Sequence, residues 1–336
     1  MWWPYGGRVD WTRLPLARAT VDRAAHRRTE PELLDGAWSA PGTQVLVLAD
    51  GRLATRAADG RVHLDLRDAA TITLVRSDAA TADLDADSDP DDHAPTPPEP
   101  LVVFLGEADD GAAFLALVVD SAARLVGGED LTWDTLRDIG HRLDDRDAGL
   151  AAAAVGLAAW HERHPRCARC GGPTVPALGG WTRRCTLDGS DHYPRTDPAV
   201  IMAVVDDDDR LLLGHGAQWP ERRFSTLAGF VEPGESAEGA VRREVLEEVG
   251  VPVTDVVYRG SQPWPFPASL MLAFVARATS TVLHVDGEEV TDARWFTRAE
   301  LEAAVAGGDV LLPMRTSVAR ALIEEWFGGD VGGHWS

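Results

Sequence analysis

Lysine is absent from this chain, because all 32 basic residues among its 336 are arginines. A lysine Schiff base and the lysine of a Walker-A phosphate loop are therefore excluded. Acidic residues outnumber the arginines: 54 Asp and Glu give a formal net charge of −22. This excess of negative charge argues against a broad basic groove for nucleic acid, but it leaves room for a local cluster of arginines.

Cysteine is scarce as well, since the chain has only three, at positions 167, 170 and 185. Three clustered cysteines exclude a disulfide framework spread over the chain. A tight cluster in a reducing compartment is more typical of a metal site. A redox Cys-x-x-Cys pair is the weaker alternative, because no thioredoxin-like strand precedes the motif.

Long apolar runs are also missing. The first 13 residues lack the continuous apolar segment that a signal peptide requires. The Ala-rich run at 150–160 has 11 residues, whereas a transmembrane helix needs about 20. We therefore expect a cytoplasmic protein without a membrane partner.

The length predicts two or three domains, at roughly 100 to 200 residues for each. Short strands and two helices indicate an α+β domain over residues 1–160. The expected strands are 43–49, 71–75, 101–106 and 114–120, and the expected helices are 132–143 and 149–161.

Three further segments complete the predicted organisation. Residues 77–100 carry seven Asp and five Pro, which predicts a disordered acidic loop, with an acidic interaction tail as the alternative. Residues 161–195 hold the cysteine cluster. Residues 196–328 mix strands with two helices and predict an α/β or α+β catalytic domain. Its expected elements are the strands 199–205, 210–213 and 271–278 and the helices 236–249 and 315–327.

The predicted helix 236–249 carries paired carboxylates. Ser236 is a plausible N-cap and Gly250 a plausible left-handed stop. Glu244 and Glu248 lie one turn apart on the edge of the buried face, and Glu247 lies about 60° to the far side of Glu244. Converging carboxylates repel each other unless a cation neutralises them, and Mg²⁺ or Mn²⁺ prefers such oxygen ligands. The alternative is a solvated acidic face.

A longer pattern surrounds this helix: Gly, five residues, Glu, seven residues, then Arg-Glu-apolar-any-Glu-Glu-any-Gly-apolar. Its specified positions are met by Gly229, Glu235, Arg243, Glu244, Val245, Glu247, Glu248, Gly250 and Val251. The pattern resembles the signature of the Nudix hydrolases. The resemblance implies an α/β/α sandwich in which Glu244, Glu247 and Glu248 hold the catalytic metals, whereas Arg243 and Glu235 orient the loop and helix by ion pairing.

A second motif, Ser-Gln-Pro-Trp-Pro-Phe-Pro-Ala-Ser at 261–269, has three prolines and two aromatic residues. The prolines stiffen the backbone, so Trp264 and Phe266 could stack on a planar ring while Gln262 reads its amide edge. A Pro-rich surface loop is an equal alternative. Behind a Nudix box, the motif resembles the signature of the NADH pyrophosphatases. That family hydrolyses NAD(H) to AMP and nicotinamide mononucleotide, and its bacterial members also remove NAD caps from RNA.

The resemblance implies further site residues and a homodimer. Tyr193 and Phe230 match aromatics that flank the nicotinamide, Tyr193 from the partner subunit. The carbonyl of Ala228 and the carboxylate of Glu289, with Glu288 as its rival, match metal ligands. The remaining implied substrate-binding residues are Gln262, Pro263, Trp264, Pro265, Phe266, Pro267, Ala268, Ser269 and Ala319.

The cysteine cluster reads as a zinc knuckle with one ligand changed. Cys167 and Cys170 form the first pair, and Cys185 follows after 14 residues. The family has a second Cys-x-x-Cys here, but this sequence has Asp188 in place of the fourth cysteine. Asp188 is one candidate for the fourth ligand of a structural zinc, His192 is another, and an absence of zinc is the third reading.

The expected fold is thus a Nudix α/β/α sandwich preceded by a zinc-ribbon module and an N-terminal Nudix-like α+β domain. The expected activity is metal-dependent hydrolysis of the pyrophosphate of NAD(H), with removal of NAD caps from RNA as a further one. Hydrolysis of ADP-ribose or another nucleoside diphosphate derivative is the alternative within the same chemistry. A non-catalytic Nudix-like ligand sensor is the alternative from another class.

Overall fold

The computed structural model describes residues 9–74, 99–128 and 131–333, which divide into two compact units. The N-terminal unit spans residues 19–195, and the C-terminal unit joins residues 9–18 to residues 196–333. Residues 9–18 had been expected in the N-terminal domain. They lie with the C-terminal unit because Leu14 is buried in its core and the Leu16 N–H donates to Gln262.

The N-terminal unit is built on a mixed seven-stranded sheet with the order β3-β2-β1-β6-β5, in which β4 also pairs with β1 and β7 with β2. β1 and β6 are parallel. The strands are β1 (Gln44–Ala49), β2 (Arg52–Ala58), β3 (Arg61–Leu64), β4 (Leu66–Asp68), β5 (Leu101–Glu107), β6 (Ala113–Val119) and β7 (Thr132–Asp134). The helices are α1 (Leu33–Ser39), α2 (Leu136–Ile139) and α3 (Asp145–Arg163), with 3-10 turns η1 (Ala25–Thr29), η2 (Ala69–Thr71) and η4 (Ala122–Arg124).

Two predictions for this unit are wrong. Residues 71–74, the described part of the predicted strand 71–75, are not a strand: Thr71 ends the 3-10 turn η2, and Leu74 makes an isolated bridge to Leu125. The segment 132–143 is not one helix, because β7 comes first and the Thr135 side chain then caps the four-residue α2. The acidic loop predicted at 77–100 lies outside the described residues except for its last two.

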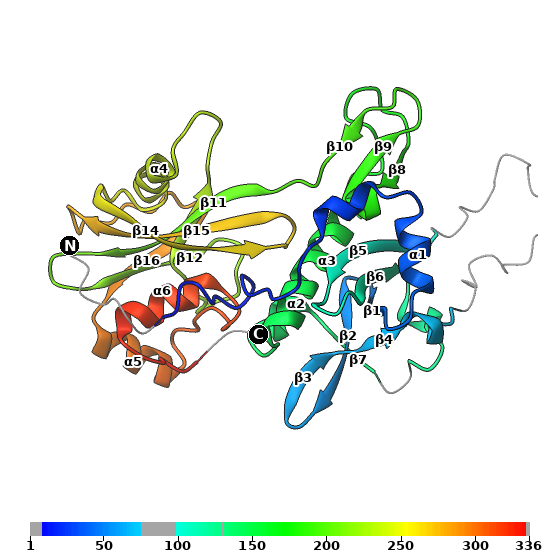
Figure 1. Ribbon diagram of the computed structural model, residues 1–336. Helices are drawn as coiled ribbons and strands as arrows, with labels where there is room; N and C mark the ends of the chain where they lie inside the picture. The colour runs from blue at the N-terminus through cyan, green and yellow to red at the C-terminus, as the bar shows by residue number, and fades with distance from the viewer. Residues whose placement is uncertain (1–8, 75–98, 129–130, 334–336) are drawn as a thin grey trace, which may run out of the picture. The chain divides into compact units, whose positions relative to one another are not determined.

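The cysteine cluster lies on a small three-stranded antiparallel sheet at the end of the N-terminal unit. Its strands are β8 (Thr174–Ala177), β9 (Thr182–Cys185) and β10 (Asp191–His192), with the 3-10 turn η5 (Leu178–Gly180) between β8 and β9. β9 pairs with both neighbours. The short strands leave the cysteine-bearing turns at one end of the sheet (Figure 1).

The C-terminal unit is a six-stranded sheet with the order β14-β15-β11-β12-β16, to which β13 adds beside β11. β11 and β15 are parallel, and β13 pairs antiparallel with β11. The strands are β11 (Asp197–Val205), β12 (Leu211–Gly216), β13 (Leu227–Phe230), β14 (Val253–Trp264), β15 (Ser269–Ala278) and β16 (Val290–Phe296). The helices are α4 (Ala237–Val249), α5 (Arg298–Gly307) and α6 (Val318–Phe327).

Helices cover both faces of this sheet. α4 packs its Val241, Val245 and Val249 stripe into one core, and α6 packs Leu322 and Trp326 into the other. Figure 1 shows α4 and α6 on opposite sides of the strands. The expected α/β/α sandwich is therefore confirmed, although the sequence predicted two helices here and the structure has a third, α5.

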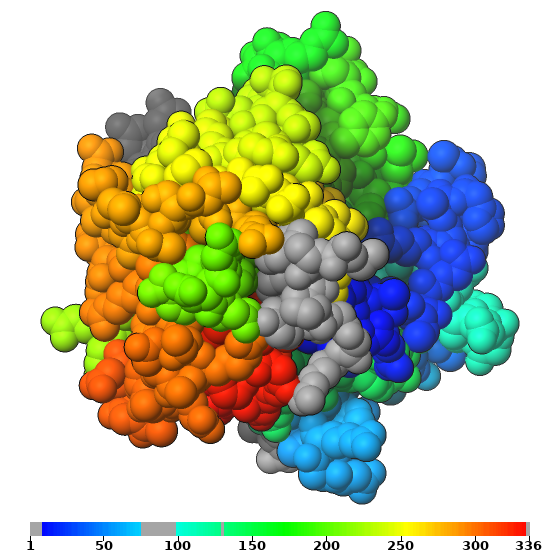
Figure 2. Space-filling model, turned by 90° about the vertical axis from the view of Figure 1, so that its left-hand side faces the viewer, coloured from blue at the N-terminus to red at the C-terminus, as the bar shows by residue number. Residues whose placement is uncertain are grey.

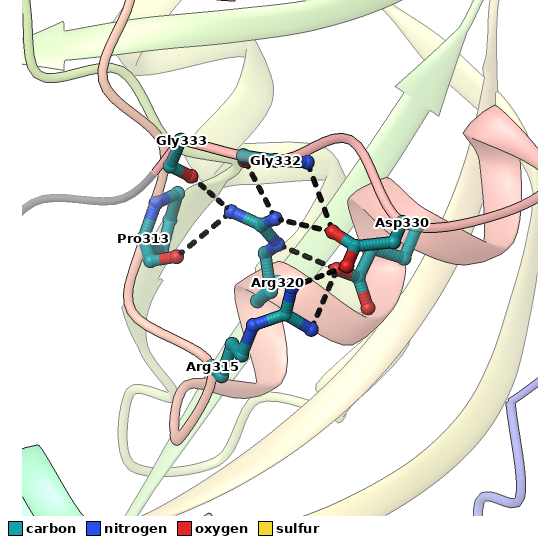
Figure 3. Close-up of polar contacts among 7 residues, drawn as sticks. Pro313, Arg315, Arg320, Asp330, Gly332 and Gly333 are labelled. Carbon is teal, nitrogen blue, oxygen red and sulfur yellow. Dashed lines mark hydrogen bonds and ion pairs between the residues drawn. The ribbon is translucent and has the colours of Figure 1, made fainter.

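A buried arginine fixes the end of the chain to α6. Arg320 is 2% exposed, and its guanidinium donates to the Gly332 carbonyl at 2.7 Å and to Asp330 at 3.2 Å. Arg315 pairs with the same Asp330, so two guanidinium groups converge on one carboxylate (Figure 3). This cluster anchors the tail and explains how the helix can bury a charged side chain.

Candidate active site

α4 places its carboxylates as the helical spacing predicts. The Ser236 side chain accepts a hydrogen bond from the Gly239 N–H at 3.1 Å, and Gly250 ends the helix in the left-handed region with φ 72°. Glu244 and Glu248 are only 8% and 6% exposed, whereas Glu247 is exposed. Two acidic side chains are therefore buried one turn apart, which is costly without a positive partner.

Arg243 joins the helix to the loop that precedes it. Its guanidinium donates to both oxygens of Glu235, at 2.8 and 3.0 Å. It also donates to Glu244 at 2.8 Å, to Glu247 at 3.0 Å and to the Phe230 carbonyl at 2.9 Å. The hydrogen bonds that Arg243 donates to Glu235 are the main cause that raises the pKa of Arg243. Arg243 therefore orients the carboxylates and stays charged.

Glu248 is buried and has several acidic neighbours. Its Oε2 is buried and has no hydrogen-bond partner among the described residues. Burial, followed by repulsion from Glu244, Glu289, Asp286 and Glu247, raises its pKa to about 8. Burial also raises the pKa of Glu244. A nearby divalent cation would reverse this preference for the protonated form, because it favours the carboxylate.

Gly229 is required by the close approach of β13 to α4. A Cβ atom at this position would lie 1.9 Å from the Glu244 Cδ atom. Real Cβ atoms never come so close, so only glycine lets the Glu244 carboxylate lie against the strand. The neighbouring Ala228 is half-buried and pairs with Ile201 of β11.

The loop before β16 carries the other predicted metal ligand. Asp286 accepts hydrogen bonds from the N–H groups of Glu288, Glu289 and Val290, and its own N–H donates to the Glu248 carbonyl at 3.1 Å. Asp286 thus holds this loop against the end of α4. The sequence motifs do not indicate this role, although Asp-Gly is a turn signal.

These elements surround a cleft of about 380 Å³. In Figure 2 the yellow segment that includes α4 borders the orange segment that includes the loop before β16. The cleft is lined by Gly214, Gly216, Ala217, Gln218, Trp219, Thr226, Leu227, Ala228, Glu248, Glu288, Glu289 and Val290. Glu288 and Glu289 both line it, so the choice between them stays open.

The donor set fits a hard divalent cation. Carboxylate oxygens and the Ala228 segment line one cleft, and a buried Glu248 oxygen lacks a partner. The acids do not converge closely: among the described residues, the groups of three or more donors within 4.8 Å are the cysteine cluster and His63, Asp144 and Asp147. The Glu244 carboxylate instead accepts a hydrogen bond from Arg243, because carboxylates without a cation between them repel each other.

The second group is structural rather than a metal site. The Asp147 carboxylate accepts hydrogen bonds from the Leu64 backbone N–H at 3.0 Å and from the Arg146 side chain at 2.9 Å. Asp144 caps the start of α3 by accepting from the Asp147 N–H at 2.8 Å. Both carboxylates therefore have partners that explain their positions.

The Pro-rich motif forms the end of β14, a four-residue turn and the start of β15. Gln262 was expected to present its amide to a ligand, and this expectation is corrected. Its side chain is fully buried: Oε1 accepts from the Leu16 N–H at 3.2 Å, and Nε2 donates to the Thr316 carbonyl at 2.9 Å. The amide is therefore occupied in fixing two distant backbone segments.

The rest of the motif is more accessible. Trp264 and Phe266 are half-buried and meet edge to face at 4.9 Å between ring centroids. Pro265 is buried, Pro267 is exposed, and Pro263, Ala268 and Ser269 are half-buried. Ala319 is 1% exposed in the α6 core, so its side chain is not at the surface where a ligand could reach it.

The two predicted stacking aromatics are both strongly exposed. Tyr193, in the N-terminal unit, is 69% exposed, and Phe230, at the end of β13, is 58% exposed. Single exposed apolar side chains are common on protein surfaces, but a ring must be accessible if it is to stack on a ligand. Their exposure therefore fits a ligand-binding role for both side chains.

The cysteine cluster assembles with Asp188. The Sγ atoms of Cys167, Cys170 and Cys185 and a carboxylate oxygen of Asp188 all lie within 4.8 Å of one another. Cys170 and Cys185 are 3.5 Å apart, close to the roughly 3.8 Å edge that follows from tetrahedral zinc–sulfur bonds of about 2.3 Å. His192 Nε2 lies 3.2 Å from Cys167 Sγ, so it is the nearest competitor. Three sulfurs and one oxygen fit a structural zinc.

Hydrogen bonds lower the pKa of Cys167 and of Asp188 and so favour their charged forms, which are the forms that bind metal. Contact with Ser190 lowers the pKa of Cys167 to about 6. The Ser190 hydroxyl and N–H both donate to Asp188, at 2.6 and 2.9 Å, and lower the pKa of that carboxyl. The N–H of Gly172 favours the Cys170 thiolate, but the neighbouring Cys185 and burial outweigh it and raise the pKa of Cys170 to about 11.

Among the described helices, none combines the length and the hydropathy that a bilayer crossing requires.

Three family models match the chain in succession. A NADH pyrophosphatase-like rudimentary NUDIX domain matches residues 42–160, a NADH pyrophosphatase zinc ribbon domain matches residues 162–193, and a NUDIX domain matches residues 195–314.

Known proteins match over nearly the whole chain. It is 40% identical over 323 residues to proteins named NAD-capped RNA hydrolase NudC from Mycobacterium bovis (strain BCG) and Mycobacterium tuberculosis, covering 93% of this chain and 94% of each relative. It is 43% identical over 197 residues to human NAD-capped RNA hydrolase NUDT12, covering 55% of this chain and 43% of that protein. The chain therefore belongs to the Nudix hydrolases, in the family that combines a NUDIX domain with a rudimentary NUDIX domain and a zinc ribbon of the NADH pyrophosphatase type.

Proposed function

We propose that this protein hydrolyses the pyrophosphate of NAD(H) to nicotinamide mononucleotide and AMP, and that it also removes NAD caps from RNA. The observation that carries the proposal is the buried pair Glu244 and Glu248, in which Glu244 binds Arg243 and Glu248 lines a cleft of about 380 Å³. The substrate class is supported by the names of the mycobacterial and human relatives.

Mg²⁺ or Mn²⁺ would be held by Glu244, Glu247, Glu248, Glu289 and the carbonyl of Ala228. When bound, the metal supplies neutralisation of the pyrophosphate and a water of lowered pKa. Arg243 keeps Glu244 and Glu247 oriented through its hydrogen bonds at 2.8 and 3.0 Å. Gly229 lets the Glu244 carboxylate lie against the strand. These residues therefore position the acidic groups before a substrate enters.

One carboxylate, Glu247 or Glu248, takes the proton from the attacking water. Glu248 is the better placed, because it lines the cleft whereas Glu247 is exposed outside it. The water oxygen bonds to one phosphorus, the bridging P–O bond breaks, and the other phosphate leaves. No covalent intermediate with the protein is needed.

Outside the catalytic cleft, we propose a structural zinc on Cys167, Cys170, Cys185 and Asp188. We also propose a homodimer in which Tyr193 reaches the partner's site and, with Phe230, flanks the nicotinamide. The exposure of Tyr193 supports this arrangement. A cytoplasmic location completes the proposal.

The test is chromatography of NADH incubated with the purified protein and Mg²⁺ or Mn²⁺, beside NAD⁺ and ADP-ribose. AMP and reduced nicotinamide mononucleotide should appear only with metal. Glu248→Gln should lower kcat by about 10² or more, because it removes a metal ligand and proton acceptor. Its matched control is Glu238→Gln, an exposed acid in the first turn of the same helix, which should retain normal turnover.

Other outcomes would contradict the proposal in distinct ways. Cleavage of ADP-ribose without cleavage of NADH would leave the chemistry intact and change the substrate. A folded, metal-bound protein that cleaves none of these compounds would support the ligand sensor. Normal turnover by Glu248→Gln would move the active site away from this helix.

A further inference from the structure

The catalytic cleft has a second wall that the reaction described above does not use. Besides the carboxylates, it is lined by the loop after β12, with Gln218 and Trp219, and by Thr226 just before β13. None of these residues was singled out by the sequence motifs. Their chemistry, an indole ring and a hydroxyl, differs from that of the acidic wall.

Trp219 is a rigidly held and exposed aromatic ring. The residue is 40% exposed, and its backbone N–H donates to the Gly216 carbonyl at 2.9 Å. The ring lies on Gly216, where a Cβ atom would be 3.0 Å from two ring carbons. His215 meets the ring nearly edge to face at 6.5 Å. An exposed ring whose position on the cleft wall is fixed by its neighbours is preorganised for stacking.

The Trp219 loop is also tied to the acidic loop. The Ala217 N–H donates to the Glu289 carbonyl at 2.9 Å. The pairing of β12 with β16 shifts register between His215 and Gly216. Such a bulge bends the strand and re-aims the side chains beyond it. The position of the ring relative to Glu289 is therefore set by backbone contacts.

Thr226 supplies an independent indication of a ligand. It is 4% exposed and lines the cleft, yet its hydroxyl has no hydrogen-bond partner among the described residues. Buried hydroxyls are nearly always paired, because an unpaired one loses its hydrogen bonds to water. A group entering the cleft would provide the missing partner.

Along the backbone, Thr226 and Phe230 lie on either side of Ala228, which lines the cleft. Gly214 and Ser225 exchange backbone hydrogen bonds of 2.8 and 2.9 Å, so the chain is already extended before β13. Side chains two apart in an extended chain share a face, so Thr226, Ala228 and Phe230 form a row about 13 Å long. Ala228 lies at its centre, where it lines the cleft with Glu248.

We propose that Trp219 and Thr226 form a subsite for the second nucleoside of the substrate, the one that lies across the pyrophosphate from Phe230. The base stacks on Trp219, and the Thr226 hydroxyl bonds to the ribose or to the adjoining phosphate. The acidic lining of the cleft, with Glu248, Glu288 and Glu289, favours an uncharged aromatic base over an additional anion here. This inference rests on the proposed dinucleotide hydrolysis.

The first test measures binding rather than turnover. Calorimetry with AMP and with ribose 5-phosphate, both in Mg²⁺, reports the contribution of the base. The wild-type protein should bind AMP more tightly, and Trp219→Ala should lose this preference by about tenfold or more, because stacking on an aromatic ring has that magnitude. Trp219→Phe should keep most of it. Thr226→Val should weaken both ligands equally.

The matched control is Tyr258→Ala, which removes an aromatic side chain that is 51% exposed on β14 and does not line the cleft. It should bind AMP like the wild type. Equal binding of AMP by the wild type and Trp219→Ala would overturn the proposal. So would an equal loss of AMP and ribose 5-phosphate in Trp219→Ala, because that result indicates damage to the cleft rather than loss of stacking.

Turnover then separates this inference from the proposed function. Trp219→Ala should lower kcat/KM for NADH but not for an analogue in which hydrogen replaces the adenine. If the wild type cleaves no NADH, the proposed hydrolysis fails, while the AMP measurement still decides the subsite. If NADH is cleaved and Trp219→Ala affects both substrates alike, the subsite fails and the hydrolysis stands.

Discussion

At the scale of single residues, contacts within the site depend on side chains that are absent or short. Gly229 has no Cβ, which lets Glu244 approach the strand. Asp188 has a short side chain, and its carboxylate lies among the three cysteines. Arg243 satisfies three carboxylates and one carbonyl. The resemblance to the Nudix hydrolases implied that Arg243 and Glu235 meet. Their distances came only with the structure.

Gly229→Ala should impair catalysis more than folding. The added Cβ would overlap the Glu244 carboxyl at 1.9 Å, so Glu244 must move and kcat should fall by at least about tenfold. The measurement is kcat for NADH beside thermal unfolding. Gly36→Ala in α1, where a Cβ meets nothing within 4 Å, is the control and should keep full activity. Unchanged kcat in Gly229→Ala would show that the Glu244 position is not critical.

The fourth zinc ligand can be decided by two substitutions. Asp188→Ala should release zinc at lower chelator concentration than the wild type, because it removes an oxygen within 4.8 Å of all three thiols. His192→Ala should have a smaller effect. Zinc content during titration with a chromogenic chelator measures both. The opposite order would assign the ligand to His192, and a wild-type protein without zinc would reject the site.

At the scale of elements, α3 is tied to the cysteine-bearing sheet by a buried histidine. The His161 Nε2–H donates to the Gly180 carbonyl at 2.8 Å, and Arg183 donates to Nδ1 at 2.8 Å. The Arg183 guanidinium also donates to the hydroxyl and to the backbone carbonyl of Thr174 in β8, both at 2.6 Å. The arrangement needs a neutral imidazole, since Nδ1 must accept.

The stability of the fold should therefore depend on His161 in acid. Burial above all, against the hydrogen bond to Gly180 and with the charge of Arg183, lowers its pKa from 6.5 to about 4. Between these values the unfolded chain binds a proton that the folded chain does not, so stability falls as the pH falls from about 6.5 to about 4. The loss is at most about 3 kcal/mol. Urea unfolding at several pH values measures it.

His161→Gln is the matched variant for this measurement, because glutamine retains a donor and an acceptor but does not titrate in this range. Its stability should change less between pH 6.5 and 4 than that of the wild type. An identical pH dependence in both proteins would exclude His161 as the responsible group.

At the scale of the whole molecule, charge limits how RNA can bind. The net charge of −22 opposes a polyanion, yet Arg166 and Arg169, which neighbour Cys167 and Cys170 in the sequence, are exposed. Arg184 is exposed too, but it is paired with Asp191 at 2.7 Å. RNA contacts should therefore be few and local, and the NAD cap must provide most of the recognition.

Salt should accordingly distinguish the two substrates. Two or three phosphate contacts predict a loss of about tenfold in kcat/KM for NAD-capped RNA between 50 and 200 mM salt. The value for NADH should change much less, because NADH offers no phosphates beyond its pyrophosphate. Parallel rate measurements with both substrates test this. Equal salt dependence would mean that the RNA beyond the cap is not bound.

By itself, the sequence determined the features that reside in one continuous stretch. The cap at Ser236, the stop at Gly250 and the buried edge with Glu244 and Glu248 follow from helical spacing, and all three are found in α4. The cysteine motif likewise predicted a cluster of the three cysteines, with Asp188 and His192 as candidates for a fourth ligand, and Asp188 is found with them. Local geometry suffices for the helix because its partners lie within about one or two helical turns, whereas the two cysteine-bearing turns are brought together by the pairing of β8 with β9.

Only the tertiary structure decided the roles that depend on distant partners. Gln262, expected to face a ligand, instead binds Leu16, 246 positions away, and Thr316, 54 positions away. Trp219 and Thr226 reach the cleft because β12, β13 and β16 converge there with α4. No local pattern records such meetings, because the direction of a side chain depends on which strands pair and in which register.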